Sequence, residues 1–513
     1  MNRYVRNLIL RYKDYKEAII NEINTNRFYY AFLLLILMVS FYLYMKFRFF
    51  ERAFTWDEAN YAGTARTLYR NFFDYSMNGE PQLYLPPVYP YLLAIFYKIF
   101  GLNEASIRLV NPILGVLTLI ILFSFARRLF DINVALISTI LLSAYYLHWI
   151  YSDRLMTDVL FELLVLGLFY TFYIGFEDEK PIFLYISGVL LGISYLTRYS
   201  TPILLLILFL YVILSRKSLD WIKKKEIWLA LLCFIMIIAP YEMWKAQLTG
   251  KPFGFFQSFL GGWAGGYAIF PWYMFGKWLF FESDYFNRSL LIFGILAVLG
   301  IFITGMRFFD KNTKEDLLLL IWFFLPFIVA SLHPHKESRY LLFIVPALVI
   351  MTSNAILLLG NLIARHAEYP KYGLLIAILF SLMCSYQTAL PATDYFKYAG
   401  SSWVQLKNAG EFIDKNTPKD TKIISESVPQ LYYYSDRIIV PFPKNKTELL
   451  RKSLEKNIDL IVLTPERMTP NYAFEFLLQN PDLFIPYRFF VDNPRQPRDF
   501  ALVFKINKNK IEE

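Results

Sequence analysis

The segment "YYAFLLLILMVSFYLYMKFRFFERAFTWDEANY" (residues 29–61) decides the fold class of this chain. Residues 29–49 are predominantly apolar, over about the 20 residues that an α-helix needs to cross a bilayer. Two adjacent carboxylates, Asp57 and Glu58, follow shortly after that run ends. Ionisable residues at a membrane boundary often serve a function, so the segment predicts a polar site where the chain leaves the membrane.

The composition excludes an ordinary soluble protein. Of 513 residues, 56% are hydrophobic and 19% are aromatic, and the mean hydropathy is positive. These values predict a polytopic membrane protein. The net charge of +10 is expected on cytoplasmic loops that face anionic lipids. Nucleic acid is not an expected partner, because no basic cluster interleaves with aromatic residues outside the membrane. Cys233 and Cys384 lie inside apolar runs and are expected to be packing residues.

Hydropathy and charge together predict the topology. About 11 transmembrane helices are expected, at residues 29–49, 107–126, 132–151, 156–175, 182–197, 200–215, 227–246, 289–306, 316–333, 340–363 and 371–390. By the positive-inside rule, lysine and arginine place in the cytoplasm the connections at 127–128, 216–225, 307–314 and 365–371. The acidic connection "EDEK" (177–180) fits that rule less well.

Three parts of the chain follow from this topology. Residues 1–28 are charged throughout, show no cleavable signal peptide and carry apolar residues spaced three or four apart, which predicts a cytoplasmic amphipathic helix. Residues 29–390 form the transmembrane domain, whose first outside loop covers residues 50–106. Residues 391–513 alternate short strands with amphipathic helices, which predicts a small extracytoplasmic α/β domain.

Four ionisable clusters fall on the outer side of the predicted membrane. They are the Asp57-Glu58 pair, Arg154 with Asp158, Arg198, and the segment "HPHKESRY" (333–340). Their convergence on one face predicts a site for a charged group. Structural interpretations remain open for each cluster. Asp57 could be a helix N-cap, Arg154 and Asp158 are four apart and could form an ion pair on one helix, and Arg198 could be an interfacial arginine.

The basic segment and the carboxylates complement each other chemically. His335, Lys336 and Arg339 lie on the outside, against the positive-inside tendency, and an anionic lipid phosphate would explain them. A carboxylate at the membrane surface can act as a general base toward an acceptor hydroxyl. The Asp57-Glu58 pair could also hold a divalent cation, although no further carboxylates cluster nearby in the sequence.

With these motifs the chain resembles the GT-C membrane glycosyltransferases that use polyprenyl-phosphate sugars. The greatest similarity is to the protein O-mannosyltransferase and aminoarabinose-transferase-like group (glycosyltransferase family 39/83-like). Asp57, Glu58 and Tyr61 match the "DExxY" motif of the first outside loop in that group. The proline-rich motif "PPxYP" is matched at residues 86–90.

The later motifs extend the resemblance over nearly the whole chain. Asp158 looks like a second acidic position at the start of the fourth span, and Arg198 like a basic residue after the fifth. The segment "HKESRY" (335–340) is similar to the "HKExRF" motif of lipid mannosyltransferases that use dolichol-phosphate-mannose, with Tyr340 in place of Phe. In the aminoarabinose branch a lysine precedes the two prolines and meets the donor phosphate, whereas here that residue is Leu85. This departure argues against that branch.

The resemblance implies a role for each matched residue. The implied catalytic residues are Asp57, Glu58 and Asp158. The implied ligands of the donor phosphate are Arg198, His335, Lys336 and Arg339. The residues expected to position substrates are Tyr61, Pro87, Tyr89, Arg154 and Tyr340.

The expected function is the transfer of a sugar, mannose or a related hexose, from a polyprenyl- or dolichyl-phosphate donor to an acceptor hydroxyl, with inversion. The acceptor is left open among a protein, a glycan and a lipid, and no cofactor is certain. The expected location is the extracytoplasmic face of a prokaryotic plasma membrane, bacterial or archaeal. The alternative is a transporter or flippase of a lipid-linked or anionic substrate. The gathering of charge at one face argues against it, with Glu162 and Glu242 as exceptions inside or near spans.

Overall fold

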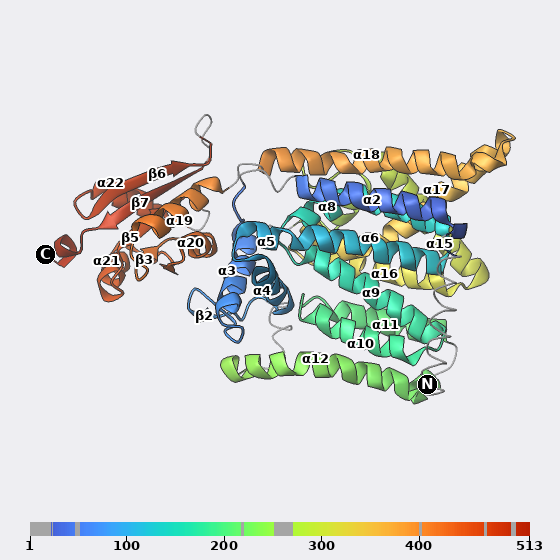
Figure 1. The fold of residues 1–513 in the computed structure, drawn as a ribbon, viewed down its shortest axis with the longest axis horizontal. Coiled ribbons are helices and arrows are strands. Elements are labelled where there is room, and N and C mark those ends of the chain that lie inside the picture. Colours follow the sequence, from blue (N-terminus) through green and yellow to red (C-terminus); the bar gives the residue numbers. More distant parts are fainter. Residues whose placement is uncertain are drawn as a thin grey trace, which may run out of the picture.

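The computed structural model describes residue 22 and residues 24–46, 52–216, 220–250, 270–399, 403–465, 469–493 and 499–512. Most of the expected amphipathic helix in residues 1–28 lies outside these ranges. The described chain forms a bundle of long, roughly parallel and antiparallel helices with a small sheet domain at one end (Figure 1).

The described parts of all eleven apolar segments predicted as spans are mainly helical. Within the described residues, eight helices are long and apolar enough to cross a membrane, and a bent pair makes a ninth. The eight are α2 (Arg27–Lys46), α5–α6 (Glu104–Leu129), α9 (Asp158–Glu177), α12 (Lys225–Thr249), α15 (Leu291–Lys311), α16 (Lys314–Leu332), η3–α17 (Ser338–His366) and η4–α18 (Pro370–Ala399). The bent pair is α7 (Ile132–Ala144) and α8 (Tyr146–Asp153), which meet at 60°. The two remaining segments are the shorter helices α10 (Pro181–Tyr195) and α11 (Pro202–Ser215).

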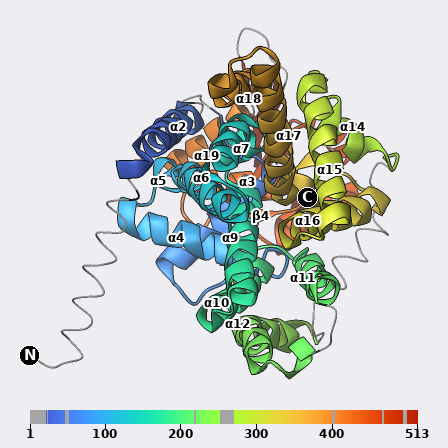
Figure 2. The same cartoon turned by 90° about the vertical axis from the view of Figure 1, so that its right-hand side faces the viewer.

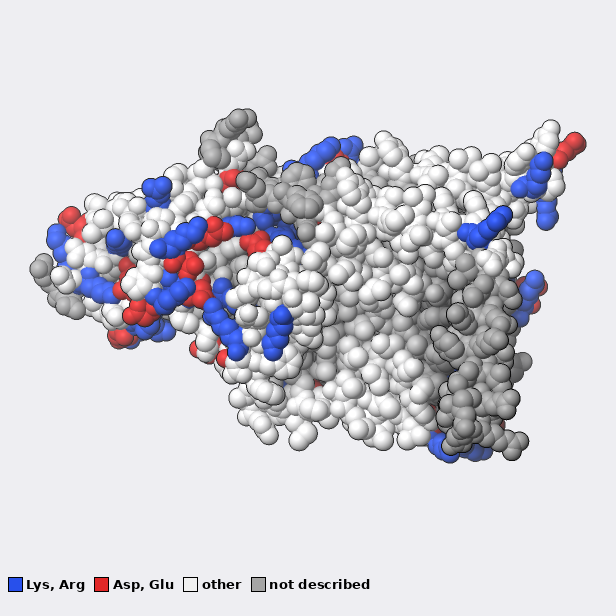
Figure 3. Space-filling view, viewed as in Figure 1, with Lys and Arg blue, Asp and Glu red and all other residues white. Residues whose placement is uncertain are grey.

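Central and peripheral helices are apolar for different reasons, because the central ones are buried in protein and the peripheral ones are not. In the apolar window of η3–α17, 89% of residues are buried within the protein, whereas in α2 and α12 only 17% are buried. Seen along the bundle, α2 and α12 lie at its periphery (Figure 2). An apolar helix that leaves most of its surface uncovered is stable only in lipid. Charged side chains gather at the two ends of the molecule and leave an almost uncharged band between them (Figure 3).

The acidic connection after α9 is neutralised by cations from other parts of the bundle. Glu177 lies 3.3 Å from Arg216 and also pairs with Lys314. The next two residues pair with Arg128 and, at 2.8 Å, with Lys224. The acidic connection "EDEK" is therefore compatible with a cytoplasmic location, because its carboxylates pair with basic residues of the other connections predicted to be cytoplasmic.

The C-terminal domain is a five-stranded mixed sheet with the order β4-β3-β5-β7-β6. The strands are β3 (Lys422–Ile424), β4 (Ile438–Val440), β5 (Leu460–Leu463), β6 (Phe484–Val491) and β7 (Phe500–Ile506). The first three are parallel, and β7 runs antiparallel to β5 and β6. Two apolar clusters pack against the sheet. One includes side chains of α19 (Val404–Asn416) and α20 (Val428–Ser435), and the other includes α21 (Lys446–Glu455) and α22 (Asn471–Gln479).

The sheet domain docks onto α3 (Trp56–Arg70), the helix that begins with the carboxylate pair. The Tyr434 hydroxyl accepts a 2.8 Å hydrogen bond from the backbone N–H of Phe54, just before α3. Further along α3, the buried Arg66 guanidinium donates to the carbonyls of Tyr432 and Tyr433 at 2.6 and 2.5 Å. The domain is therefore fixed to the same helix whose first turn carries Asp57 and Glu58.

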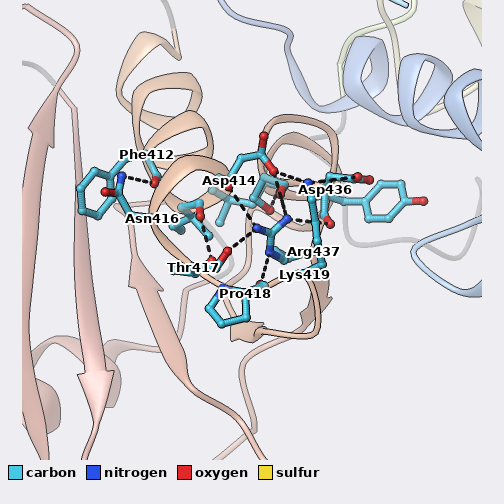
Figure 4. A network of polar contacts seen from close by, with 12 residues as sticks. Phe412, Asp414, Asn416, Thr417, Pro418, Lys419, Asp436 and Arg437 are labelled. Carbon is cyan, nitrogen blue, oxygen red and sulfur yellow. Dashed lines mark hydrogen bonds and ion pairs between the residues drawn. The ribbon is translucent and has the colours of Figure 1, made fainter.

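Arg437 makes the docking edge of the domain rigid (Figure 4). Its guanidinium donates to the carbonyls of Thr417, Pro418 and Ser435 at 2.7–2.8 Å and lies 3.0 Å from the Asp414 carboxylate. These acceptors lie at the end of α19, in the turn after it and at the end of α20. Arg437 thereby supplies donors to carbonyls that have no partner at helix ends, and it fixes the segment that contacts α3.

Candidate active site

The two neighbouring carboxylates of α3 have different environments. The Glu58 side chain is completely buried, whereas the Asp57 side chain is 41% exposed. Consecutive residues on a helix point about 100° apart, which follows from 3.6 residues per turn. One residue of the pair therefore faces the protein interior while the other faces an accessible space.

Glu58 joins three parts of the chain. Its carboxylate lies 3.0 Å from Arg52 and 3.7 Å from Arg154, and it accepts hydrogen bonds from the backbone N–H groups of Thr55 (2.9 Å) and Leu155 (3.1 Å). Burial would by itself raise the pKa of Glu58, but the surrounding arginines lower it to about 2. This environment favours a structural role for Glu58, and its catalytic assignment remains a prediction.

Asp57 faces a second group of charges. Arg339, at the start of η3, lies 3.2 Å from the Asp57 carboxylate and 2.6 Å from Glu337. Glu337 also lies 3.0 Å from His335 and accepts a 3.0 Å hydrogen bond from the Tyr340 hydroxyl. The nearby Arg339 guanidinium outweighs the effect of burial and lowers the pKa of Glu337. Sequence reasoning named the residues around Glu337 but not Glu337 itself, the acid inside "HKESRY" that pairs with His335 and Arg339.

Arg198 completes the group from the turn after α10. It forms an ion pair with Asp158, the first residue of α9. The Tyr340 ring lies near both guanidinium groups, with its centroid 5.8 Å from the Arg198 Cζ atom and 5.7 Å from the Arg339 Cζ atom. Elements that are far apart in the sequence thus bring together Asp57, Arg339, Tyr340, Arg198 and Asp158.

The ion pair between Arg154 and Asp158 that the sequence left open does not form. Both residues were placed on one helix, but α8 ends at Asp153 and α9 begins at Asp158, so four-residue spacing does not put them on one face. Arg154 instead donates to the Thr55 hydroxyl at 3.1 Å and approaches Glu58, whereas Asp158 pairs with Arg198. Arg154 and Asp158 therefore each interact with a residue of a different segment and not with each other.

Lys336 has a different orientation from Arg339. It is 3% exposed, and its ammonium group donates to the backbone carbonyls of His333 and, at 3.4 Å, Phe270. Burial lowers the pKa of Lys336. These contacts connect the segment before η3 to the chain at Phe270.

The proline-rich motif links the helix α4 (Val88–Phe100) to the turn that carries Arg198. Pro87 directly precedes α4, and the N–H of Val88 donates to the carbonyl of Leu196 at 3.0 Å. The Tyr89 hydroxyl donates to Asn111 at 2.7 Å. The Tyr89 ring also meets the edge of Tyr61, at a centroid distance of 5.0 Å.

Asn111 was not found by sequence reasoning. Its amide donates to the backbone carbonyls of Tyr151 and Met156 at 3.0 and 2.9 Å and also to that of Arg154. It therefore fixes the bend between α8 and α9, which positions Arg154 and Asp158. The signal that could have revealed it is a lone asparagine at the start of an apolar span, since a buried amide needs partners.

Lys245 is a second residue that the sequence did not reveal. It is 6% exposed and donates to the Tyr199 hydroxyl at 3.1 Å. Tyr199 in turn contacts Tyr241, whose hydroxyl donates to the carbonyl of Leu85 at 3.4 Å. A lysine from α12 is thus connected by two phenols to Leu85, where the sequence lacks the lysine of the aminoarabinose branch.

The described residues contain no cluster of three or more histidine, cysteine, aspartate or glutamate side chains that could hold a metal ion. Asp57 and Glu58 are each paired with arginine instead. The acidic residues present here do not form the oxygen-rich ligand set that Ca²⁺ or Mg²⁺ prefers.

Comparison with known proteins gives matches over different lengths of the chain. Residues 84–244 match the family model described as dolichyl-phosphate-mannose-protein mannosyltransferase. An uncharacterized protein of Aquifex aeolicus (strain VF5) is 24% identical over 310 residues, and the alignment covers 58% of this chain and 58% of that relative. The matched part is therefore little more than half of each chain.

Solved structures match along nearly the whole chain. ArnT from Cupriavidus metallidurans bound to undecaprenyl phosphate has a TM-score of 0.64 at 15% identity, covering 94% of this chain and 98% of that one. The oligosaccharyltransferase AglB from Archaeoglobus fulgidus, in complex with an inhibitory peptide and a dolichol-phosphate, has a TM-score of 0.61 at 14% identity, covering 95% and 77%. The match of residues 84–244 to the mannosyltransferase model and the similarity to ArnT and AglB confirm the expected resemblance, and the chain has the GT-C fold.

Proposed function

We propose that this protein is a membrane glycosyltransferase that moves a sugar from a polyprenyl- or dolichyl-phosphate donor to an acceptor hydroxyl. The proposal rests on one observation above all. An accessible carboxylate, Asp57, lies 3.2 Å from Arg339, and the Tyr340 ring connects Arg339 to the Arg198–Asp158 pair. A base and two cations at one accessible place are the groups that this transfer requires.

Arg198 and Arg339 bind the phosphate of the donor. A guanidinium group presents a planar set of donors that matches phosphate oxygens. Arg198 and Arg339 are only 20% and 16% exposed, so they act where water screens their charge less than at an open surface. Because the lipid phosphate gains negative charge as the glycosidic bond breaks, these cations stabilise the transition state more than the bound donor.

Asp57 accepts the proton of the acceptor hydroxyl as that oxygen attacks the anomeric carbon. Proton removal by a positioned side chain contributes a factor of about 10² to 10⁴. The donor phosphate is a good leaving group, so one displacement is sufficient and the configuration at the anomeric carbon inverts. Asp158 holds Arg198 in place through its ion pair, and the phenols of Tyr61 and Tyr89, whose rings contact each other, lie within the electrostatic influence of Asp158.

The donor sugar that fits the family match is mannose or a related hexose. The lipid carrier is supported by the undecaprenyl phosphate and dolichol-phosphate that ArnT and AglB bind. The predicted topology, in which the basic loops are cytoplasmic, supports an extracytoplasmic site, and the membrane we propose is the plasma membrane. The acceptor, a protein, glycan or lipid, is to be identified from the product.

The test is sugar transfer by the purified protein in lipid nanodiscs. Wild type would be supplied with radiolabelled dolichyl-phosphate mannose, and then with undecaprenyl-phosphate hexoses, in a membrane extract that provides acceptors. Release of lipid phosphate, with the label moved to an acceptor, is expected. Asp57→Asn and Arg339→Ala should lower the rate by about a hundredfold or more, whereas Glu80→Gln, a change at an exposed carboxylate of the same loop, should not.

A different outcome would favour transport. If wild type binds the lipids but cleaves none of them across several sugars and acceptors, the transferase proposal is wrong. The protein would then be reconstituted into liposomes, and the flipping of fluorescent polyprenyl-phosphate sugars across their bilayer would be measured. The two carboxylates inside or near spans, which were exceptions to the argument against transport, have partners inside the bundle. Glu162 lies 2.7 Å from His148, and Glu242 accepts a 2.8 Å hydrogen bond from Tyr195.

A further inference from the structure

The short loop between α14 (Met274–Phe280) and α15 contacts the start of η3, next to Arg339 of the candidate active site. Its ends are joined by backbone hydrogen bonds from Ser283 to Arg288 (2.8 Å) and from Leu290 to Phe281 (2.8 Å), and Glu282 forms a bridge with Ser289. We call residues 281–290 the α14–α15 hairpin. No residue of this hairpin was assigned a function from the sequence.

A turn at its tip and an ion pair near its end shape the hairpin. Phe286 and Asn287 at its tip both have positive φ, 61° and 48°. The backbone hydrogen bond between Ser283 and Arg288 encloses residues 284–287 as a four-residue loop, and Phe286 and Asn287 turn the chain at its end. Arg288 further anchors the hairpin by an ion pair of 2.5 Å to Asp394 of α18. The hairpin is therefore a fixed support for its other side chains.

Two of these side chains reach residues of the site. Asp284 accepts a hydrogen bond from the hydroxyl of Ser338, the first residue of η3. The next residue of η3 is Arg339, which pairs with Asp57. The Tyr285 hydroxyl lies 3.1 Å from that of Tyr151, at the end of α8.

We propose that Asp284 is a positioning residue that holds the start of η3 through Ser338 and thereby fixes Arg339 opposite Asp57. This inference rests on the proposed function, because its effect on transfer is exerted through Arg339. Asp284 itself is not expected to touch donor or acceptor.

Burial at the hairpin makes this contact sensitive to pH. Although Asp284 as a whole is partly exposed, its Oδ1 atom is buried. Burial raises the pKa of Asp284 to about 6, from an ordinary value of 3.8. The groups that face Asp284 are the phenols of Tyr145, between α7 and α8, and Tyr146 of α8, the hydroxyl of Ser338 from η3 and the phenol of Tyr285 from its own hairpin.

Groups from two other elements lie near Tyr285. Arg154, at the end of α8, faces Tyr285, and the ring of Tyr395 from α18 lies 4.9 Å from the Tyr285 ring. Among the described residues, no cation lies within ion-pair distance of the Asp284 carboxylate. As the pH falls through about 6, Asp284 takes up a proton and loses the charge that strengthens its hydrogen bond to Ser338.

The test is the pH dependence of kcat/KM for Asp284→Asn, with Ser338→Ala and Ser338→Thr as partners. Wild type is expected to lose kcat/KM on the acid side with a midpoint near pH 6. Asp284→Asn and Ser338→Ala should lower kcat/KM at pH 7.5 by roughly 10- to 100-fold, the factor for a hydrogen bond to a charged group, and should no longer show that acid limb. Ser338→Thr keeps the hydroxyl and should restore both the rate and the acid limb.

A matched control and a second measurement keep the outcomes distinct. Glu282→Gln changes another carboxylate of the same hairpin, which pairs with Lys277 at 3.1 Å, and should leave the profile unchanged. Hydrogen exchange of the peptide covering η3, corrected for the intrinsic pH dependence, should increase below pH 6 in wild type but be uniformly high in Asp284→Asn. If Asp284→Asn retains the acid limb with the same midpoint and η3 exchanges as in wild type, the inference is wrong. If wild type transfers no sugar, the proposed function fails, and the exchange measurement alone still decides whether Asp284 holds η3.

Discussion

Replacing Glu58 with glutamine separates the structural carboxylate of the pair from the one proposed to act in catalysis. Glutamine has nearly the same shape, but it carries no charge and only one acceptor oxygen. In the native structure one carboxylate oxygen accepts from the N–H of Thr55, and the other accepts from Arg52 and from the N–H of Leu155. Glutamine must therefore present its NH₂ group to one of these donors.

The expected loss of stability can be estimated in two ways. Removing one partner of a buried ion pair costs about 3 to 5 kcal/mol, because the other charge stays buried without compensation. Independently, the pKa of Glu58 is lowered from its ordinary value of 4.5 to about 2, which corresponds to about 3 kcal/mol of folding free energy at neutral pH. With a shift of about 2 °C per kcal/mol for a large domain, the melting temperature should fall by roughly 6 to 10 °C.

The assay is thermal unfolding of the protein in detergent, followed by size-exclusion chromatography of the protein that remains in solution. Asp57→Asn is the matched control, since Asp57 is 41% exposed and pairs with a single arginine. An exposed pair contributes about 1 kcal/mol or less, so the melting temperature of Asp57→Asn should stay within about 2 °C of wild type. The two substitutions should thus have opposite effects, with stability lost in one and sugar transfer lost in the other.

The pH dependence gives a further check on Glu58. Its pKa is lower in the folded protein than in the unfolded chain, so its contribution is fully present above about pH 4.5 and is lost as the pH falls toward 2. The difference in melting temperature between wild type and Glu58→Gln should therefore shrink in that window. A Glu58→Gln protein that melts within 2 °C of wild type at pH 7 would refute the structural role of Glu58.

Three further predictions follow from other contacts. Arg198→Ala should weaken the binding of undecaprenyl phosphate by about tenfold or more, measured by titration in nanodiscs, because a charge-assisted hydrogen bond is lost; unchanged binding would contradict its proposed role. Arg66→Met should let limited trypsin digestion release the C-terminal domain faster than in wild type, since it removes the guanidinium that binds the carbonyls of Tyr432 and Tyr433; an equal rate would show that Arg66 does not hold the domain. Lys407→Met breaks the partly exposed pair with Glu104 and should shift the melting temperature by no more than about 2 °C, because such pairs contribute little.

The sequence by itself determined the class of fold and most of the helical segments. Runs such as residues 29–49 and 340–363 are too apolar and too long for anything but helices in a membrane, since only a helix satisfies its own backbone in lipid. The charged, alternating pattern after residue 391 likewise predicted a separate domain with short strands, which forms the sheet around β3 and β5. These features depend on local composition and periodicity, which a sequence displays directly.

Only the tertiary structure decided which charges meet. The sequence placed Arg154 and Asp158 on one helix, but a bend between α8 and α9, held by Asn111, sends them to different partners. From the sequence both Asp57 and Glu58 were candidate catalytic residues, with Asp57 the preferred base, and only the fold decides which of two adjacent side chains faces the interior. An ion pair depends on distances of 3 to 4 Å between elements far apart in the chain, and these distances are set by the packing of the helices.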